Sequence, residues 1–199
     1  ETTPLRAGLP VSVTFAILGT PELPSVTLGL GSLTATTAEP VELEAGVYQW
    51  VFQRTLQGDE GEGTKYLTIT GSDVAGNSYS VLFEEHPLAL DFTLPSAVCK
   101  FAPSQAKLGD TVTLTVNASE PLLAGLPEFF SALDFAAPAP DPDATSFEYS
   151  HLVATADGAL TTWSYTVVLT DRAGNISGGD SACTGSGQLD AISPVVLEA

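Results

Sequence analysis

The sequence predicts an all-β protein made of two tandem β-sandwich domains. A strand-like run followed by Asp-x-Ala-Gly-Asn ends at Asn77 and again at Asn175. The two copies are 98 residues apart, which is the length of one small β-domain and too long for a solenoid repeat. Hydrophobic residues make up 44% of the 199-residue chain, enough to fill one core in each copy.

In the first copy, short or alternating apolar runs predict strands, and nearby Gly and Pro separate them. The runs cover residues 11–15, 26–30, 41–43, 48–52 and 66–70. The second copy repeats the series at residues 112–116, 147–153 and 163–169. Its middle stretch, residues 122–144, is richer in Pro and Phe, and predicts either a short helical turn or an edge strand.

The two copies align over more than the shared phrase. Residues 8–15 match residues 109–116, and residues 48–52 match residues 149–153, both at an offset of 101. The internal spacing of these runs is therefore the same in both copies. We interpret this agreement as a duplicated scaffold.

At this offset His151 takes the place of Trp50, which predicts a partly buried structural histidine. The offset falls to 98 after Phe52, so the first copy should contain three extra residues beyond this point. We expect them in the acidic, glycine-rich residues 58–63, because surface loops tolerate insertions at little cost in stability.

The junction segments set the predicted domains at residues 1–88 and 92–190. Residues 90–95 and 189–194 share a Leu-Asp start and a Pro end, so residues 191–199 are expected to begin a linker to a next module. The linker between the two sandwiches is predicted at residues 84–95. Glu1 in place of Met agrees with a segment taken from a longer array.

The charge argues for a solvated extracellular surface. The net charge is −18, and the acidic excess is spread evenly over the two copies. Nucleic-acid partners are disfavoured, because phosphates require a basic binding surface. No apolar run approaches the roughly 20 residues of a membrane helix, so no membrane insertion is expected in this segment. Calcium is the candidate counter-ion for such a surface.

The repeated phrase is typical of a hairpin turn between the last two strands of each sandwich. An Asp after a strand accepts backbone N–H groups, while Gly and Asn tolerate the positive φ of a tight turn. A calcium role is the weaker interpretation, because one carboxylate falls short of the six to eight oxygens that the ion takes. The turn residues are Asp73, Gly76, Asn77, Asp171, Gly174 and Asn175.

These motifs resemble the bacterial immunoglobulin-like (Big-type) repeats of surface proteins and adhesins. The resemblance is carried by LTITGSDVAGN and VVLTDRAGN, by the early strand GDTVTLTV at residues 109–116, and by Ser119-Glu120-Pro121. The first copy departs from it, with Leu9-Pro10 in place of Asp-Thr and no Ser-Glu-Pro. The resemblance implies two immunoglobulin-like sandwiches that act as an extracellular spacer or ligand-presenting stalk.

The two cysteines, Cys99 and Cys183, bracket the second copy. In immunoglobulin-like sandwiches the first and last strands run near one another, so the resemblance makes a disulfide between them reasonable. Such a bond favours an extracellular location. The alternative is two separate buried thiols.

Two groups of residues are candidate binding sites. Glu84, Glu85 and Asp91 flank the predicted linker and could share a calcium ion, although a solvated acidic linker is the simpler interpretation. An exposed aromatic platform for carbohydrate or protein could come from Phe129, Phe130 and Phe135, which are otherwise expected in the core.

No arrangement typical of a catalytic site, such as Gly-x-Ser-x-Gly, Cys-x-x-Cys or His-Glu-x-x-His, occurs in the sequence. Three classes of function remain. The first is a non-catalytic structural or adhesive repeat whose expected partners are neighbouring repeats, with a surface glycan or protein as a further candidate. The others are a carbohydrate- or protein-binding module and an accessory segment of a secreted enzyme.

Overall fold

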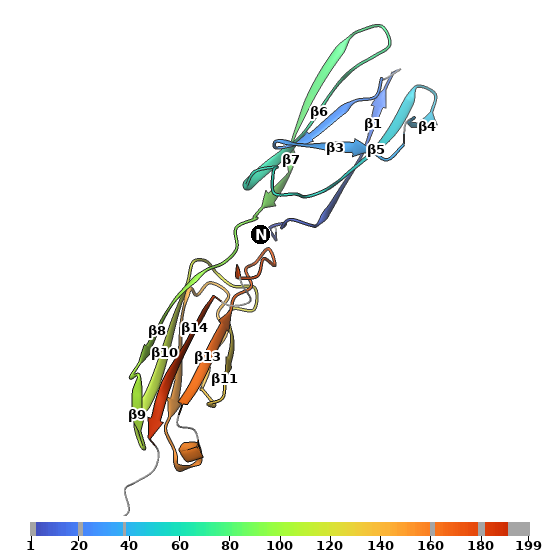
Figure 1. Cartoon of the computed structure of the whole chain (residues 1–199). Coiled ribbons are helices and arrows are strands. Elements are labelled where there is room, and N and C mark those ends of the chain that lie inside the picture. Colours follow the sequence, from blue (N-terminus) through green and yellow to red (C-terminus); the bar gives the residue numbers. More distant parts are fainter. Residues whose placement is uncertain (1–2, 20–21, 38, 160–161, 179–181, 191–199) are drawn as a thin grey trace, which may run out of the picture. The chain divides into compact units, whose positions relative to one another are not determined.

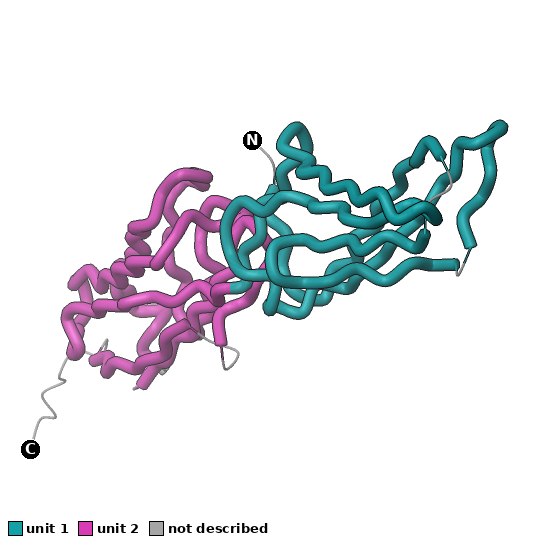
Figure 2. The backbone as a smooth tube through the Cα atoms, turned by 90° about the horizontal axis from the view of Figure 1, so that it is seen from above, with its two compact units in different colours: residues 1–92 teal, residues 93–199 magenta. Residues whose placement is uncertain are grey.

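The structure, a computed structural model, describes residues 3–19, 22–37, 39–159, 162–178 and 182–190. Within these ranges it consists of strands and loops with one short 3₁₀ helix, η1 (Thr155–Ala159). The chain divides into two compact units, Glu1–Phe92 and Thr93–Ala199, drawn in different colours in Figure 2. No helix in the described part of the chain is long and apolar enough to cross a membrane.

Unit 2 is an immunoglobulin-like sandwich of two sheets (Figure 1). One sheet has the order β12-β10-β8 and the other has the order β11-β13-β14-β9. The strands are β8 (Ala97–Ala102), β9 (Gln105–Lys107), β10 (Thr111–Ala118), β11 (Glu128–Ser131), β12 (Ser146–Leu152), β13 (Thr162–Val168) and β14 (Cys183–Asp190). The ambiguous middle stretch thus contains an edge strand, β11.

Period-two alternation places the core of unit 2 between these sheets. On β10, Val112, Leu114 and Val116 are fully buried, and the residues between them are more exposed. They belong to one cluster with Trp163 and Tyr165 of the opposite sheet. Full burial of each aliphatic side chain stabilises the unit by roughly 1.5 to 3 kcal/mol.

Glycines on β14 make room for the aromatic rings of its neighbour β13. Tyr165 pairs with Gly185 and Trp163 pairs with Gly187. A Cβ atom at either glycine would lie 2.6 Å from the paired ring. Each ring therefore lies over the glycine opposite it, and a side chain there would displace the core.

A disulfide joins Cys99 on β8 to Cys183 at the start of β14, with a Cα–Cα distance of 6.3 Å. Because β8 and β14 belong to different sheets, the bond connects the two layers. β9, which follows β8, pairs in parallel with the end of β14. The last strand of unit 2 is thus joined covalently to β8 and by hydrogen bonds to β9.

Unit 1 is a sandwich whose two layers are continuous through one strand. Its order is β1-β5-β3-β2-β6-β7, with β4 added to β5. β3 pairs first with β2 and then, at Thr34 and Ala35, with β5, so it passes from one layer to the other. The strands are β1 (Pro10–Leu18), β2 (Ser25–Leu28), β3 (Gly31–Ala35), β4 (Val41–Glu44), β5 (Val47–Thr55), β6 (Gly63–Ser72) and β7 (Ser78–Leu90).

The strand register corrects the predicted alignment of the two copies. Phe15 on β1 pairs with Trp50, and Val116, its counterpart on β10, pairs with Phe147. The counterpart of Trp50 is therefore Phe147, and the expectation that His151 replaces Trp50 is wrong. On the same register, His151 corresponds to Arg54, because Val11 pairs with Arg54 and Val112 pairs with His151.

The position of the extra residues changes with this register. Phe15 and Trp50 are 35 residues apart, whereas Val116 and Phe147 are 31 apart, so four extra residues of the first copy precede Trp50. The additional strand β4 lies in that stretch. The expectation of an insertion in the acidic residues 58–63 is therefore wrong.

The predicted linker also begins later than expected. Glu84 and Glu85 lie inside β7, which continues to Leu90. Leu67 pairs with Phe83 while Lys65 pairs with Leu88, so residues 84–87 form a bulge on β7. Proline is tolerated in such a bulge, and Pro87 marks it.

We predict that reduction of the disulfide destabilises unit 2 and leaves unit 1 unchanged. The bond spans 84 residues, and its loss costs roughly 4 to 5 kcal/mol on the chain-entropy model. Both cysteines of the chain lie in unit 2, so unit 1 is an internal control.

Urea unfolding of single-tryptophan variants separates the units, because Trp50 lies in unit 1 and Trp163 in unit 2. Within the described residues the indole N–H of each has no hydrogen-bond partner, so Trp→Phe breaks no hydrogen bond. An equal loss of unfolding free energy in both units on reduction would contradict the prediction.

Candidate functional site

Unit 1 is open along one side, where its two edge strands β1 and β7 face each other. Two adjoining hollows of about 530 and about 330 Å³ lie there, and Phe15, Ile69 and Phe83 line both. We call this opening the β1–β7 groove. Its apolar lining comes from Val13, Phe15, Ile17, Ile69, Tyr79 and Phe83.

The rim of the β1–β7 groove is polar at the bulge of β7. Glu84, Glu85 and His86 line the larger hollow and are exposed. Two of the three predicted calcium ligands, Glu84 and Glu85, therefore lie beside an apolar groove. The groove combines an apolar floor with a charged rim, an arrangement suited to an amphipathic chain segment.

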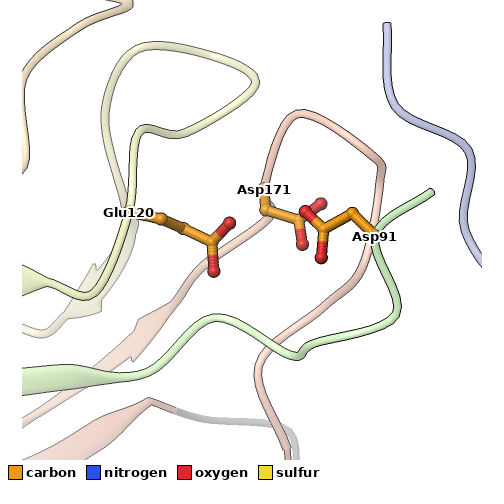
Figure 3. A group of neighbouring side chains, drawn as sticks. All are labelled: Asp91, Glu120 and Asp171. Atoms are coloured by element: carbon orange, nitrogen blue, oxygen red, sulfur yellow. The ribbon is translucent and has the colours of Figure 1, made fainter. Parts of the chain in front are cut away.

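The third predicted ligand, Asp91, belongs to a different group of carboxylates, with Glu120 and Asp171 (Figure 3). One oxygen from each lies within 4.8 Å of the others. With one ligand oxygen from each residue, the three carboxylates would supply three of the six to eight oxygens that calcium takes. The calcium hypothesis for Glu84, Glu85 and Asp91 stays a prediction, and calorimetry with millimolar calcium tests it.

The repeated phrase forms the turn between β6 and β7 and the turn after β13. In the first turn, Asp73 Oδ1 accepts the backbone N–H of Ala75 and Asn77, each at 2.9 Å, and Oδ2 accepts Asn77 Nδ2 at 2.8 Å. These hydrogen bonds, foremost that of the Asn77 side chain, lower the pKa of Asp73. Gly76 has a φ of 88°, which explains the glycine at this position.

The second turn has the same geometry in a buried setting. Asp171 Oδ1 accepts the backbone N–H of Asn175 at 2.8 Å, and its Oδ2 accepts Asn175 Nδ2 at 2.8 Å. Gly174 has a φ of 86°. Asp171 is 0% exposed and Asn175 is 8% exposed, so water cannot replace either bond.

We predict that Asp171→Ala destabilises the protein much more than Asp73→Ala. The first substitution removes the buried acceptor of two hydrogen bonds from Asn175, which costs about 3 kcal/mol. In the first turn, solvent reaches Asn77 and can replace the lost acceptor. Denaturant unfolding of the two variants measures the difference. Equal losses of unfolding free energy would show that burial of the turn does not affect its contribution to stability.

A second repeated feature ties the end of a strand to the loop that follows it. At the end of β5, Arg54 Nε donates to Glu60 Oε1, and at the end of β12, His151 Nε2 bonds Asp157 Oδ2 at 2.8 Å. In both cases the acid follows the base by six residues. We call these pairs the strand-end clamps.

The backbone contacts of the two clamps also correspond. Glu60 accepts the backbone N–H of Gln57, and Asp157 accepts that of Ala154, each three residues before the acid. The clamp therefore closes the loop as well as holding the base. Sequence reasoning missed it, and the only signal was a base and an acid six residues apart in each copy.

Close packing buries the unit 1 clamp. Glu60 is 0% exposed, and a Cβ at Gly31 would lie 2.8 Å from both Arg54 Nε and Glu60 Cγ. Burial alone raises the pKa of Glu60, but hydrogen bonds from Arg54 and from the backbone of Gln57 and Gly58 outweigh it and lower the pKa to about 2. The buried acid therefore stays ionised.

We predict an acid-dependent loss of stability in unit 1. The folded-state pKa of Glu60 lies below its ordinary value of 4.5, so its contribution is complete above about pH 4.5 and is lost as the pH falls toward about 2. The expected loss is roughly 3 kcal/mol. Glu60→Gln should abolish this dependence of the unfolding free energy on acid. Asp59→Asn changes the exposed partner of Arg54 and should retain most of the dependence. Urea unfolding at a series of pH values measures both.

The unit 2 clamp responds to pH in the opposite direction. Burial lowers the pKa of His151, but hydrogen bonds to the Asp134 carbonyl and the Asp157 carboxylate outweigh it, so the pKa is raised above 6.5. The stabilisation is therefore complete below pH 6.5 and is lost as the pH rises through the folded-state pKa.

We predict an NMR titration midpoint above 6.5 for the imidazole of His151. His86→Ala leaves His151 as the one histidine in the chain, which makes the signal unambiguous. Asp157→Asn should lower the midpoint. A midpoint below 6.5 would contradict the clamp.

The predicted aromatic platform is not assembled as one exposed face. Phe129 and Phe135 pack against the core of unit 2, and their ring centroids are 5.1 Å apart. Phe129 also stacks on Tyr149 at 4.8 Å. Phe130 points the other way and is 57% exposed.

No protein-family model and no curated protein matches the chain. Among solved structures, a set of titin domains aligns at 14% identity and a TM-score of 0.31, covering 96% of this chain and 63% of that one. A tandem pair of titin immunoglobulin domains aligns at 10% identity and a TM-score of 0.27, covering 95% of this chain and 91% of that one.

The adhesin InvE of Yersinia pseudotuberculosis aligns at 13% identity and a TM-score of 0.31, covering 94% of this chain and 56% of that one. The chain thus spans less than two thirds of the first titin structure and of the adhesin structure. The description of the fold rests on the strand pairing of the chain itself.

Proposed function

We propose that the chain is a non-catalytic structural and adhesive repeat of a bacterial surface protein, in which each sandwich is a load-bearing segment of a stalk. The observation that carries the proposal is the same in both units: a segment near the start of the sandwich pairs in parallel with the strand that leaves it. In unit 1, Leu5 pairs with Leu90, and in unit 2, β9 pairs with β14.

This pairing suits a protein under tension. Parallel neighbours that carry the two ends of a domain are pulled in opposite directions along their length. Their hydrogen bonds then share the load instead of breaking one at a time. The bonds are Leu5 N–H to the Ala89 carbonyl at 2.8 Å and Asp91 N–H to the Leu5 carbonyl at 3.0 Å in unit 1, and the β9–β14 ladder in unit 2.

The disulfide gives unit 2 a covalent load path. Tension applied to its ends passes from Cys99 to Cys183, so the 84-residue span between them, β9 included, is shielded while the bond is intact. The β9–β14 ladder takes the load when the bond is reduced. A disulfide of this kind persists in an oxidising compartment. Together with the net charge of −18, it supports an extracellular location.

The buried charged groups support a non-catalytic assignment. Glu60, His151 and Asp171 are the polar residues that a catalytic interpretation would consider first, and each is held by hydrogen bonds that close a loop or turn. These hydrogen bonds give each of the three residues a structural role.

Force spectroscopy on the chain tests the proposal. We expect two unfolding events at appreciable force, and reduction should lengthen the extension of unit 2 by about 290 Å, since 84 residues each span up to about 3.5 Å. Cys99→Ser/Cys183→Ser without reductant should reproduce the longer extension. Extension of either unit at negligible force would overturn a load-bearing role.

A binding module is the second candidate function, and the β1–β7 groove favours it. The groove offers apolar side chains and an unpaired strand edge, which suit a protein segment better than a carbohydrate.

A further inference from the structure

Residues 132–136 connect the two sheets of unit 2, and we call them the crossing segment. They follow β11, which pairs with β13, and end at Ala136, which pairs with Ser150 on β12. Ala136 N–H donates to the Ser150 carbonyl at 2.7 Å, and Ser150 N–H donates to the Ala136 carbonyl at 3.2 Å. The segment therefore passes from one layer of the sandwich to the other.

The crossing segment closes one side of the core of unit 2. Leu133 is 4% exposed, and the ring centroid of Phe135 lies 5.4 Å from that of Trp163. A third hydrogen bond joins the Asp134 carbonyl to His151 Nδ1 at 2.8 Å. The base of the unit 2 strand-end clamp thus holds this segment as well as the loop acid.

In unit 1, β3 makes the corresponding crossing between the layers. Its residue Thr34 pairs with Gln53, which the strand register makes the counterpart of Ser150. Thr34 is therefore the counterpart of Ala136.

The clamp of unit 1 holds its crossing in the same way. Arg54 Nη1 donates to the Ser32 carbonyl at 2.9 Å, as His151 bonds the Asp134 carbonyl. In both units this carbonyl belongs to the residue two positions before the one that pairs with the other sheet. Each base therefore joins a loop acid to a crossing carbonyl.

The two bases differ in whether they can lose a proton. Arginine stays charged at every pH at which proteins fold. His151 has an acceptor at each ring nitrogen, the Asp134 carbonyl at Nδ1 and the Asp157 carboxylate at Nε2. Imidazole donates both hydrogen bonds only when each nitrogen carries a proton. The contacts of His151 are therefore those of the charged imidazolium.

The proton that leaves first is the one facing the crossing segment. The Asp157 carboxylate also accepts Ala154 N–H at 2.8 Å, and this bond together with that of His151 lowers the pKa of Asp157. The ionised carboxylate retains the Nε2 proton, so Nδ1 becomes a lone pair that faces the Asp134 carbonyl oxygen. Because His151 is 9% exposed, water separates these two acceptors only if the segment moves outward.

We propose that the crossing segment of unit 2 is a pH-controlled closure, which is held while His151 carries both ring protons and opens when Nδ1 loses its proton. The crossing of unit 1, held by Arg54, stays closed over the same range. Among the described residues, the charged groups that act on His151 are Asp157 in η1 and Asp134 in the segment, and the residue paired with it on β10 is Val112. The closure does not depend on a load-bearing role of the chain.

Hydrogen exchange from about pH 5.5 to about pH 8.5, on the full chain with His86→Ala, tests the closure. The protection factor of the Ala136 amide, corrected for the intrinsic rate at each pH, should fall about tenfold or more as His151 titrates, because a hydrogen bond from a charged donor is lost. The Thr36 amide donates to the Val51 carbonyl at the end of the unit 1 crossing and should keep its protection.

The amides of β10 separate local opening from general loosening of unit 2. They should stay protected while that of Ala136 becomes exposed, because the crossing segment opens alone. An equal fall along β10 would mean that unit 2 loosens as a whole and would overturn the closure. Constant protection of the Ala136 amide through the titration of His151 would also overturn it.

Three variants show whether His151 is the group that controls the segment. His151→Gln has no titrating group and should abolish the pH dependence of Ala136 protection. Asp157→Asn keeps an oxygen for Ala154 N–H but removes the charge that holds the imidazolium, so the midpoint should move to lower pH.

Asp134→Asn is the matched control for Asp157→Asn. It removes an equal charge from the crossing segment itself but leaves the backbone carbonyl that His151 binds, so the midpoint should move much less. Equal shifts in the two variants, or a pH dependence that survives in His151→Gln, would contradict control by this hydrogen bond.

Discussion

Closure of each sandwich depends on the pairing between a segment near its start and its last strand. These segments are about 85 residues apart in sequence in both units, so their contact is formed only when the chain between them has folded. The pairing decides where tension enters a unit and brings Cys99 within bonding distance of Cys183 in unit 2. In unit 1, among the described residues, β1 pairs only with β5, and β7 pairs with β6 on one side and with Leu5 only at its end, so each presents an open edge. The mechanical role and the groove both follow from it.

The two units share one strand arrangement, but unit 2 is more completely closed than unit 1. Unit 2 has β8 over the edge of β10, a covalent bond between its layers and a core in which Val112, Leu114 and Val116 are fully buried. Unit 1 has β4 added on the far side of β5, no cysteine and an uncovered β1. A closed unit is suited to bear load, whereas an open one is suited to accept a partner.

The sequence predicted the all-β class and the hairpin turns because both depend on residues that are close together in the chain. Asp73 and Asp171 each precede their Gly and Asn at a fixed spacing, and a turn needs no distant partner. The register of β5 was not predictable in this way. Apolar alternation has a period of two, so a slip of four residues leaves the pattern unchanged, and Trp50 was aligned with His151 instead of Phe147. The slip became visible only through the pairing of each strand with its neighbour.

The strand-end clamps were missed for a related reason. Arg54 and His151 differ in chemistry, as do Glu60 and Asp157, so the copies show no repeated motif there. A charged residue in a glycine-rich acidic stretch is also expected in solvent, and the burial of Glu60 arises from Gly29 and Gly31, more than 25 residues earlier. Likewise, nothing local distinguishes the uncovered β1 from the covered β10.

Hydrogen exchange of backbone amides on the chain tests the difference in closure most directly. On β10, amides on both edges are paired, with β12 on one side and β8 on the other, so the whole strand should be protected. On β1, the account predicts alternation: amides directed toward β5 exchange slowly, and those directed toward the open edge exchange fast. Uniform protection along residues 12–17, equal to that of residues 113–118, would show that the edge is already covered and would contradict the account.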